Sequence, residues 1–219
     1  GVPRIGEPED LDEITPQSLY AHYRQILETS RVELFYMGSL APEQVTEVLR
    51  QTLQALPRAG QVVPVGTTPA PAARPVQEKT ERLDVTQGKL SLGFFTDITA
   101  NDPRYPALVL AATVFGGGAT SKLFTNVREQ MSLCYYASAS FEKFKGVLVV
   151  SSGVEFSKLE TAKKEILRQL EACCSGEISD YELESARGYL VSDLKIAMDS
   201  PGRLDDFYMG QILLESSAT

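Results

Sequence analysis

The chain has 219 residues, enough for one large domain or two small ones, and its 43% hydrophobic and 23% charged residues are typical of a soluble globular protein. The formal net charge of −8 argues against nucleic acid or an anionic membrane as a partner, because both require a basic face. No apolar run reaches the ~18–20 residues of a membrane span, and residues 106–115 cover about half of one.

The cysteines and the first residues indicate the cellular compartment of the protein. Three cysteines without a CxxC spacing favour reduced thiols and a cytoplasmic protein; they are Cys134, Cys173 and Cys174. A three-cysteine metal site is the alternative, although cysteine is often buried simply as a small hydrophobic residue. The opening residues, GVPRIGEPED, contain no apolar core, so no signal peptide is expected.

The N-terminal quarter predicts a helix, a strand and a second helix. Thr15 and Pro16 form a helix start, because a capping hydroxyl precedes a proline at the first helical position. Residues 31–38, RVELFYMG, alternate and then become apolar, which predicts a strand. Apolar residues at helical spacing predict a helix over 42–56.

Residues 57–80 interrupt this pattern with five prolines and no aromatic residue, which predicts an extended linker between two parts of the fold. The following segments predict a strand, two helices separated by glycines, and a hairpin of two strands joined by residues 142–145. The first strand is expected over 83–96 and the two helices over 103–115 and 120–131. The hairpin strands are expected over 133–141 and 146–154.

Two serines, each followed three residues later by glutamate, predict capped helix starts. Ser157 would begin a helix over 157–173, and Ser179 would begin one over 179–198, with Gly176 ending the first. A last helix is expected near Pro201. One hairpin and few crossovers favour an α+β fold, with helices packed on one face of a mainly antiparallel sheet.

The glycines of FGGGATSKLF (115–124) invite a phosphate-loop interpretation, which the spacing excludes. The motif requires a glycine, four residues, and then Gly-Lys-Ser/Thr. Counted from Gly116, the second glycine is replaced by Ser121 and the final hydroxyl residue by Leu123. The preceding segment also predicts a helix, whereas the motif follows a strand.

Zinc and serine-hydrolase motifs are absent from the sequence as well. His22 is the only histidine, so neither HExxH nor HxxEH can be written, and no GxSxG sequence accompanies a serine. His22 lies in an amphipathic segment, where a surface histidine is the simplest interpretation. The residues alone therefore indicate a domain without a complete catalytic apparatus.

Residues 115–140, FGGGATSKLFTNVREQMSLCYYASAS, resemble the most recognisable stretch of the M16 zinc metallopeptidases, a family that includes insulinases, pitrilysins and mitochondrial processing peptidases. In that family a glycine-rich turn precedes Ser-Arg-Leu-Phe, then Arg-Glu, and a tyrosine follows seven residues after that arginine. This chain has Ser-Lys-Leu-Phe at 121–124, then Arg128-Glu129, and Tyr135 seven residues after Arg128. The resemblance covers residues 1–215 and corresponds to the family's inactive domain, with its metallohydrolase fold.

The resemblance implies that the two halves of the peptidase have different roles. Zinc would lie in the other half, on an HxxEH helix, so no metal, cofactor or catalytic residue is expected in this chain. Arg128 and Tyr135 would bind the peptide substrate near the scissile bond. This chain departs from the family pattern at two positions that affect the geometry of the loop. The family commonly has arginine where Lys122 stands and glycine where Ser132 stands.

The glycine-rich loop has two interpretations. Gly116, Gly117 and Gly118 would allow one helix to end and the next to begin with close backbone approach, since glycine tolerates positive φ. In processing-peptidase-like subunits the resemblance adds a mobile loop that captures substrate. Packing is the preferred interpretation.

The family is an internal duplication, and this chain resembles a piece that spans its two repeats. Residues 1–56 match the tail of the preceding repeat, 57–80 the linker, and 81–219 the inactive domain, truncated at its C-terminal end. Strand 31–38 would then lie at a sheet edge or replace the missing tail, within one chain or by a strand swap in a homodimer.

The resulting hypothesis is a non-catalytic, substrate-binding domain that acts in proteolysis with an HxxEH-bearing M16 domain or paralogue. The sequence SLCYY (132–136) is similar to a bacterial branch in which a zinc-free member accompanies an active paralogue. The alternative is a structural or assembly subunit of an M16-fold complex without a peptidase role.

Overall fold

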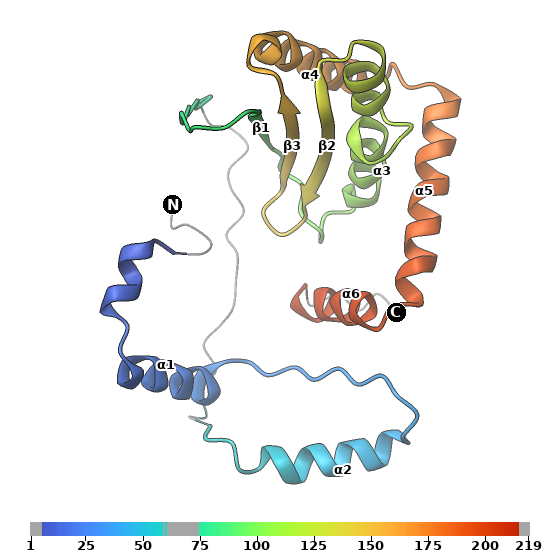
Figure 1. Cartoon of the computed structure of the whole chain (residues 1–219). Coiled ribbons are helices and arrows are strands. Elements are labelled where there is room, and N and C mark those ends of the chain that lie inside the picture. Colours follow the sequence, from blue (N-terminus) through green and yellow to red (C-terminus); the bar gives the residue numbers. More distant parts are fainter. Residues whose placement is uncertain (1–5, 59, 61–74, 215–219) are drawn as a thin grey trace. The chain divides into compact units, whose positions relative to one another are not determined.

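The computed structural model describes residues 6–58, 60 and 75–214 (Figure 1). The chain divides into two units, Gly1–Gly66 and Thr67–Thr219. The predicted linker 57–80 contains the boundary between them, and most of it lies outside the described residues. None of the described helices is both long enough and apolar enough to cross a membrane.

The first unit contains a short 3-10 helix, η1 (Pro8–Glu13), and two α-helices, α1 (Pro16–Thr29) and α2 (Pro42–Leu53). The predicted start of α1 is confirmed, since the Thr15 hydroxyl accepts a hydrogen bond from the Ser18 backbone N–H at 3.1 Å. None of the three helices contains a buried residue. Their amphipathic faces are therefore open within this unit.

The predicted strand 31–38 is wrong. Residues 31–37 have no regular secondary structure, and Leu34 and Met37 are 55% and 52% exposed. The sheet in the described part of the chain comprises only strands from the second unit. A strand needs a neighbour to satisfy its backbone N–H and C=O groups, and local alternation cannot supply one.

The second unit is built on an antiparallel sheet of β1 (Gly88–Phe95), β2 (Cys134–Glu142) and β3 (Val147–Val154), in the order β1-β3-β2. The predicted β2–β3 hairpin and the α+β class are confirmed. β1 is shorter than the predicted 83–96, because Gly88 pairs with Val154, where β3 ends. Residues 83–87 consequently have no strand beside them.

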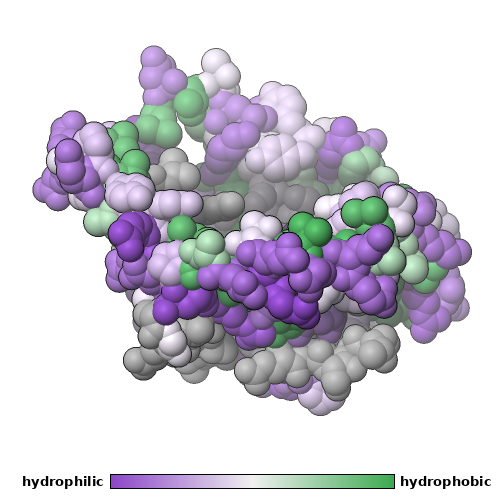
Figure 2. Space-filling model, turned by 90° about the horizontal axis from the view of Figure 1, so that it is seen from below, coloured by the Kyte–Doolittle hydropathy of each residue, from purple (hydrophilic) through white to green (hydrophobic). Residues whose placement is uncertain are grey.

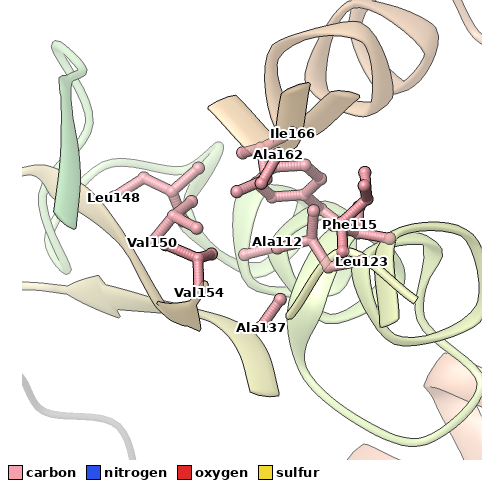
Figure 3. Packing of buried hydrophobic residues seen from close by; sticks show 11 residues of the cluster. Ala112, Phe115, Leu123, Ala137, Leu148, Val150, Val154, Ala162 and Ile166 are labelled. Carbon is pink, nitrogen blue, oxygen red and sulfur yellow. The ribbon is translucent and has the colours of Figure 1, made fainter. Parts of the chain in front are cut away.

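One face of the sheet carries the hydrophobic core (Figure 3). Leu148 and Val150 of β3 belong to one buried cluster with side chains from α3 (Tyr105–Gly116) and α4 (Leu159–Cys174), among them Phe115 and Ile166, which are at most 1% exposed. On the opposite face alternate residues of β1 and β2, such as Ser91 and Ser138, are exposed. Helices thus pack on one face, as the sequence predicts.

The segment between α3 and β2 forms a π-helix, η2 (Leu123–Gln130), rather than an ordinary α-helix. Leu123 and Val127 are fully buried and attach it to the core. At its end the Met131 N–H donates to the Asn126 carbonyl at 3.1 Å. π-helical turns are rare and frequently lie at functional sites.

The helix ends of the second unit follow local signals, with one exception. Gly176 has a φ of 82°, and the Glu177 N–H donates to the Ala172 carbonyl at 2.9 Å, which closes α4 as expected. The predicted capping box at Ser157 is wrong: a 3-10 turn, η3 (Phe156–Lys158), precedes α4, and Lys158 occupies the N-cap position.

The other predicted box forms at the start of α5 (Asp180–Met198). The Ser179 hydroxyl accepts from the Glu182 N–H at 3.3 Å, and Glu182 Oε2 accepts from the Ser179 N–H at 2.8 Å. α6 (Pro201–Leu213) follows, as expected from Pro201.

Hydrophobic side chains also remain exposed, and Figure 2 shows them between hydrophilic residues on one face of the molecule. In α5, Val191, Leu194 and Met198 are 51%, 59% and 68% exposed. Helical apolar surface of this kind is available to another protein segment.

The two serines provide a matched test of helix capping. Ser179→Ala should lower the free energy of unfolding by ~1 kcal/mol, because a donor at the start of α5 loses its acceptor, whereas Ser157→Ala should change it by less than ~0.5 kcal/mol. Thermal unfolding would show a decrease of ~2–4 °C for the first variant only. Equal decreases for both would contradict this description of the helix starts.

Candidate functional site

Arg128 lies near the end of η2, and three contacts fix its side chain. Its guanidinium carbon is 4.6 Å from the centre of the Phe124 ring, one helical turn earlier. Its Nε donates to the backbone carbonyl of Tyr135 at 2.9 Å, and one terminal nitrogen is 3.3 Å from the Glu129 carboxylate. Since Nε already has a partner, the terminal nitrogens carry the donors that remain for a ligand.

Tyr135 is the extra residue of a β-bulge. In β2, Cys134 pairs with Val154 and Tyr136 with Gly153, so Tyr135 has no partner on β3. Bulges redirect side chains and often lie next to active sites. The Tyr135 side chain is 59% exposed, while its carbonyl accepts the bond from Arg128. The structure therefore brings together the two residues that the sequence indicates.

Both residues line an open pocket of about 390 Å³. Its wall comes from the end of η2, the start of β2 and the turn before α4, and consists of Arg128, Glu129, Ser132, Leu133, Cys134, Tyr135, Glu155 and Lys158. Two cations, two carboxylates and a phenol offer hydrogen bonds at its surface. An extended peptide presents alternating carbonyl and N–H groups, which this mixture can bind.

Ser132 shapes the turn between Arg128 and Tyr135. Its φ of 49° is positive, which is unusual for a residue other than glycine. Lys158 Nζ donates to the Ser132 carbonyl at 3.2 Å, and the Leu133 N–H donates to the Val127 carbonyl at 3.0 Å. Ser132 thus adopts the left-handed conformation that a glycine would adopt at this position.

The partly buried thiols of β2 and α4 are not activated. Burial raises the pKa of the Cys134 thiol more than Ser152 and Arg128 lower it. Burial likewise raises the pKa of Cys173 to about 11. Both thiols are therefore protonated at neutral pH, which makes them weak nucleophiles.

The glycine-rich loop is explained by close packing and not by positive φ. A Cβ added to Gly116 would be 2.6 Å from the Ala139 backbone nitrogen, and one added to Gly117 would be 2.7 Å from the Thr113 Cα. One added to Gly118 would be 3.6 Å from the Tyr189 ring, an ordinary contact. The expected positive φ is wrong, because glycines with positive φ among the described residues lie elsewhere.

Sequence reasoning missed several contacts that hold this region. Lys122 is only 7% exposed, and its Nζ is 2.8 Å from Glu182 Oε1. Asn126 of η2 donates to Gln169 of α4 at 2.8 Å. The capping-box pattern identifies Glu182, but its partner is distant in sequence and no local signal indicates it.

The described residues do not suit a zinc ion. Within residues 6–58, 60 and 75–214, no three His, Cys, Asp or Glu side chains are grouped closely enough to hold a metal. His22 lies exposed on α1. The donor set that zinc requires is therefore not assembled in this part of the chain.

Comparison with known proteins places the chain among peptidase relatives. A family model described as "Peptidase M16 inactive domain" matches residues 13–190. The chain is 32% identical over 206 residues to "Probable inactive metalloprotease YmfF" of Bacillus subtilis, covering 94% of this chain and 48% of that protein. It is 24% identical to "Uncharacterized zinc protease YmxG" of the same species, covering 91% and 48%. The chain thus spans about half the length of these curated relatives.

Solved structures agree in fold. A conserved protein from Enterococcus faecalis has a TM-score of 0.86 and 31% identity, and the match covers 100% of this chain and 51% of that one. The peptidase M16 inactive domain from Pseudomonas fluorescens has a TM-score of 0.71 and 21% identity, with coverage of 87% and 46%.

Two glycines of the loop allow a direct test of the packing explanation. Gly116→Ala should lower the free energy of unfolding by ~1–3 kcal/mol, because the new methyl group would overlap the Ala139 backbone of β2. Gly118→Ala, in ordinary contact with Tyr189, is the control and should change it by less than ~0.5 kcal/mol. Urea unfolding would measure both, and equal stability of the two variants would contradict the packing explanation.

Proposed function

The chain belongs to the family of peptidase M16 inactive domains, and from this membership we propose that it binds peptide substrates for a zinc-bearing M16 half without performing catalysis itself. The proposal rests on the observation that Arg128 and Tyr135 are hydrogen-bonded to each other and line the same open pocket. The resemblance implies this pair as substrate ligands, and the geometry supports that role.

The chemistry at the pocket is hydrogen-bond donation to a peptide. The terminal nitrogens of Arg128 can donate to a substrate carbonyl, and the exposed Tyr135 hydroxyl can donate to a second acceptor. Such donors orient the chain for attack and stabilise negative charge that develops on the carbonyl oxygen. A bound zinc in the other half would supply the activated water.

The zinc-bearing half would be a separate M16 domain or a paralogous subunit, because the sequence has a single histidine and no HxxEH motif. We assign residues 1–56 to the tail of a preceding repeat and 81–219 to the inactive domain. The helices of the first unit contain no buried residue, which supports a role for them in completing another structural unit. The free cysteines support a cytoplasmic location.

Substitution of the pair tests the proposal in the assembled peptidase. Arg128→Ala and Tyr135→Phe should each lower kcat for a fluorogenic peptide by up to ~10²–10³-fold, the usual loss for one donor to a developing oxyanion. The matched controls are Tyr136→Phe, the neighbouring tyrosine that pairs with Gly153, and Arg187→Ala, an exposed arginine of α5.

The controls should retain full activity and the same thermal stability as the parent. Unchanged hydrolysis by both Arg128→Ala and Tyr135→Phe would reject the substrate-binding proposal and favour a structural or assembly subunit. An equal loss in the controls would attribute the effect to disturbed folding.

The zinc content of the full-length protein tests where the catalytic half lies. The relative with 32% identity is named a probable inactive metalloprotease, which supports a zinc-free member acting with a paralogue. We therefore expect less than stoichiometric zinc by mass spectrometry after dialysis against a weak chelator. Peptide hydrolysis should appear only when the zinc-bearing paralogue is added. One zinc per chain, together with peptide hydrolysis in the absence of the paralogue, would place both halves in one protein.

A further inference from the structure

Lys122, the residue immediately before η2, has a buried side chain that forms an ion pair with Glu182. The side chain is 9% exposed, and Nζ lies 2.8 Å from Glu182 Oε1. A buried lysine is rarely found without a paired charge, because taking an ammonium group out of water is costly. The start of η2 is thereby attached to one carboxylate on α5.

Glu182 is itself held in place by the start of α5. Its second oxygen, Oε2, accepts from both the backbone N–H and the hydroxyl of Ser179, each at 2.8 Å. The carboxylate also lies in the first turn of the helix, where the helix dipole favours negative charge. Glu182 is thus a fixed point, and Lys122 is the group that η2 directs toward it.

Hydrophobic contacts of η2 do not by themselves specify its position along the core. Leu123 and Val127 are fully buried, but apolar burial is non-directional. A buried ion pair adds little stability compared with apolar replacements, yet it can select one arrangement among several. The directional side-chain contacts of η2 and the residue before it include Lys122–Glu182 at its start, Asn126–Gln169 in its middle and Arg128–Tyr135 at its end.

We propose that Lys122 is a positioning residue, which through Glu182 sets the placement of η2 and so holds Arg128 against the Tyr135 carbonyl. The part of this inference that concerns peptide hydrolysis rests on the proposed function. The structural part, the dependence of the Arg128–Tyr135 hydrogen bond on Lys122, stands independently of it.

The structural part is tested in the complete chain by NMR of the arginine Nε–H groups. The Arg128 signal is assigned by its loss in Arg128→Lys, and its hydrogen exchange should be slow because Tyr135 accepts the bond. The double variant Lys122→Met/Glu182→Gln removes the ion pair without leaving a buried charge unpaired, and glutamine retains the capping function. Exchange of the Arg128 Nε–H should become about tenfold faster in this variant.

Two further variants separate positioning from general destabilisation. Lys122→Arg keeps the charge and should keep the slow exchange. Arg187→Met removes an exposed ion pair of α5 that does not reach η2, and should leave the exchange unchanged. Slow Arg128 exchange in the folded double variant would overturn the inference, as would an equal acceleration in Arg187→Met.

The functional part is measured as peptide hydrolysis by the assembled peptidase. The double variant should lower kcat/KM about tenfold, whereas Lys122→Arg alone, which keeps the charge, should leave it unchanged. Arg128→Ala is measured in parallel: if it leaves hydrolysis unchanged, the proposed function fails, and the exchange experiment alone still decides whether Lys122 positions Arg128. If Arg128→Ala lowers hydrolysis and the double variant does not, the inference fails and the proposed function stands.

Discussion

The hydrogen bond from Arg128 Nε to the Tyr135 carbonyl connects the last turn of η2 to the first residues of β2, and both of these segments line the pocket. It can form because two irregularities coincide. The bulge in β2 leaves Tyr135 without a partner on β3, and Ser132 reverses the chain with a positive φ. Both irregularities cost conformational freedom or strain, and both contribute to one wall of the pocket.

The core explains why this turn is well defined. η2 is anchored to the core by Leu123 and Val127, while β2 is paired with β3 on both sides of its bulge. Gly116 allows α3 to end against the backbone of β2, so the helix before η2 is also in close contact with the strand after it. A rigid support of this kind places functional side chains more accurately than a loop on the surface alone.

The features that sequence predicts correctly are those determined within a few residues. The caps at Thr15 and Ser179, the end of α4 at Gly176 and the β2–β3 hairpin all depend on neighbouring residues, and all are present. The predicted strand 31–38 failed because a strand depends on a partner from elsewhere in the chain. Ser157 failed as a cap because the chain enters α4 through a 3-10 turn.

In the candidate site, too, features set by neighbouring residues were predictable and features set by distant segments were not. The spacing of Arg128 and Tyr135 within a recognisable motif identified the pair, and the structure brings them together. The π-helical form of η2, the bulge and the Lys122–Glu182 pair were not predictable, because each arises from contacts between segments distant in sequence.

The central claim is that the pocket beside Arg128 and Tyr135 binds peptide. The most direct measurement is a crystal structure of the assembled peptidase with a bound substrate peptide, in which the glutamate of the HxxEH motif in the zinc-bearing half is replaced by glutamine to prevent cleavage. We predict that a terminal nitrogen of Arg128 and the Tyr135 hydroxyl will lie within ~3 Å of peptide oxygens, the distance of a hydrogen bond. A well-ordered peptide that contacts neither side chain would contradict the proposed role of this chain.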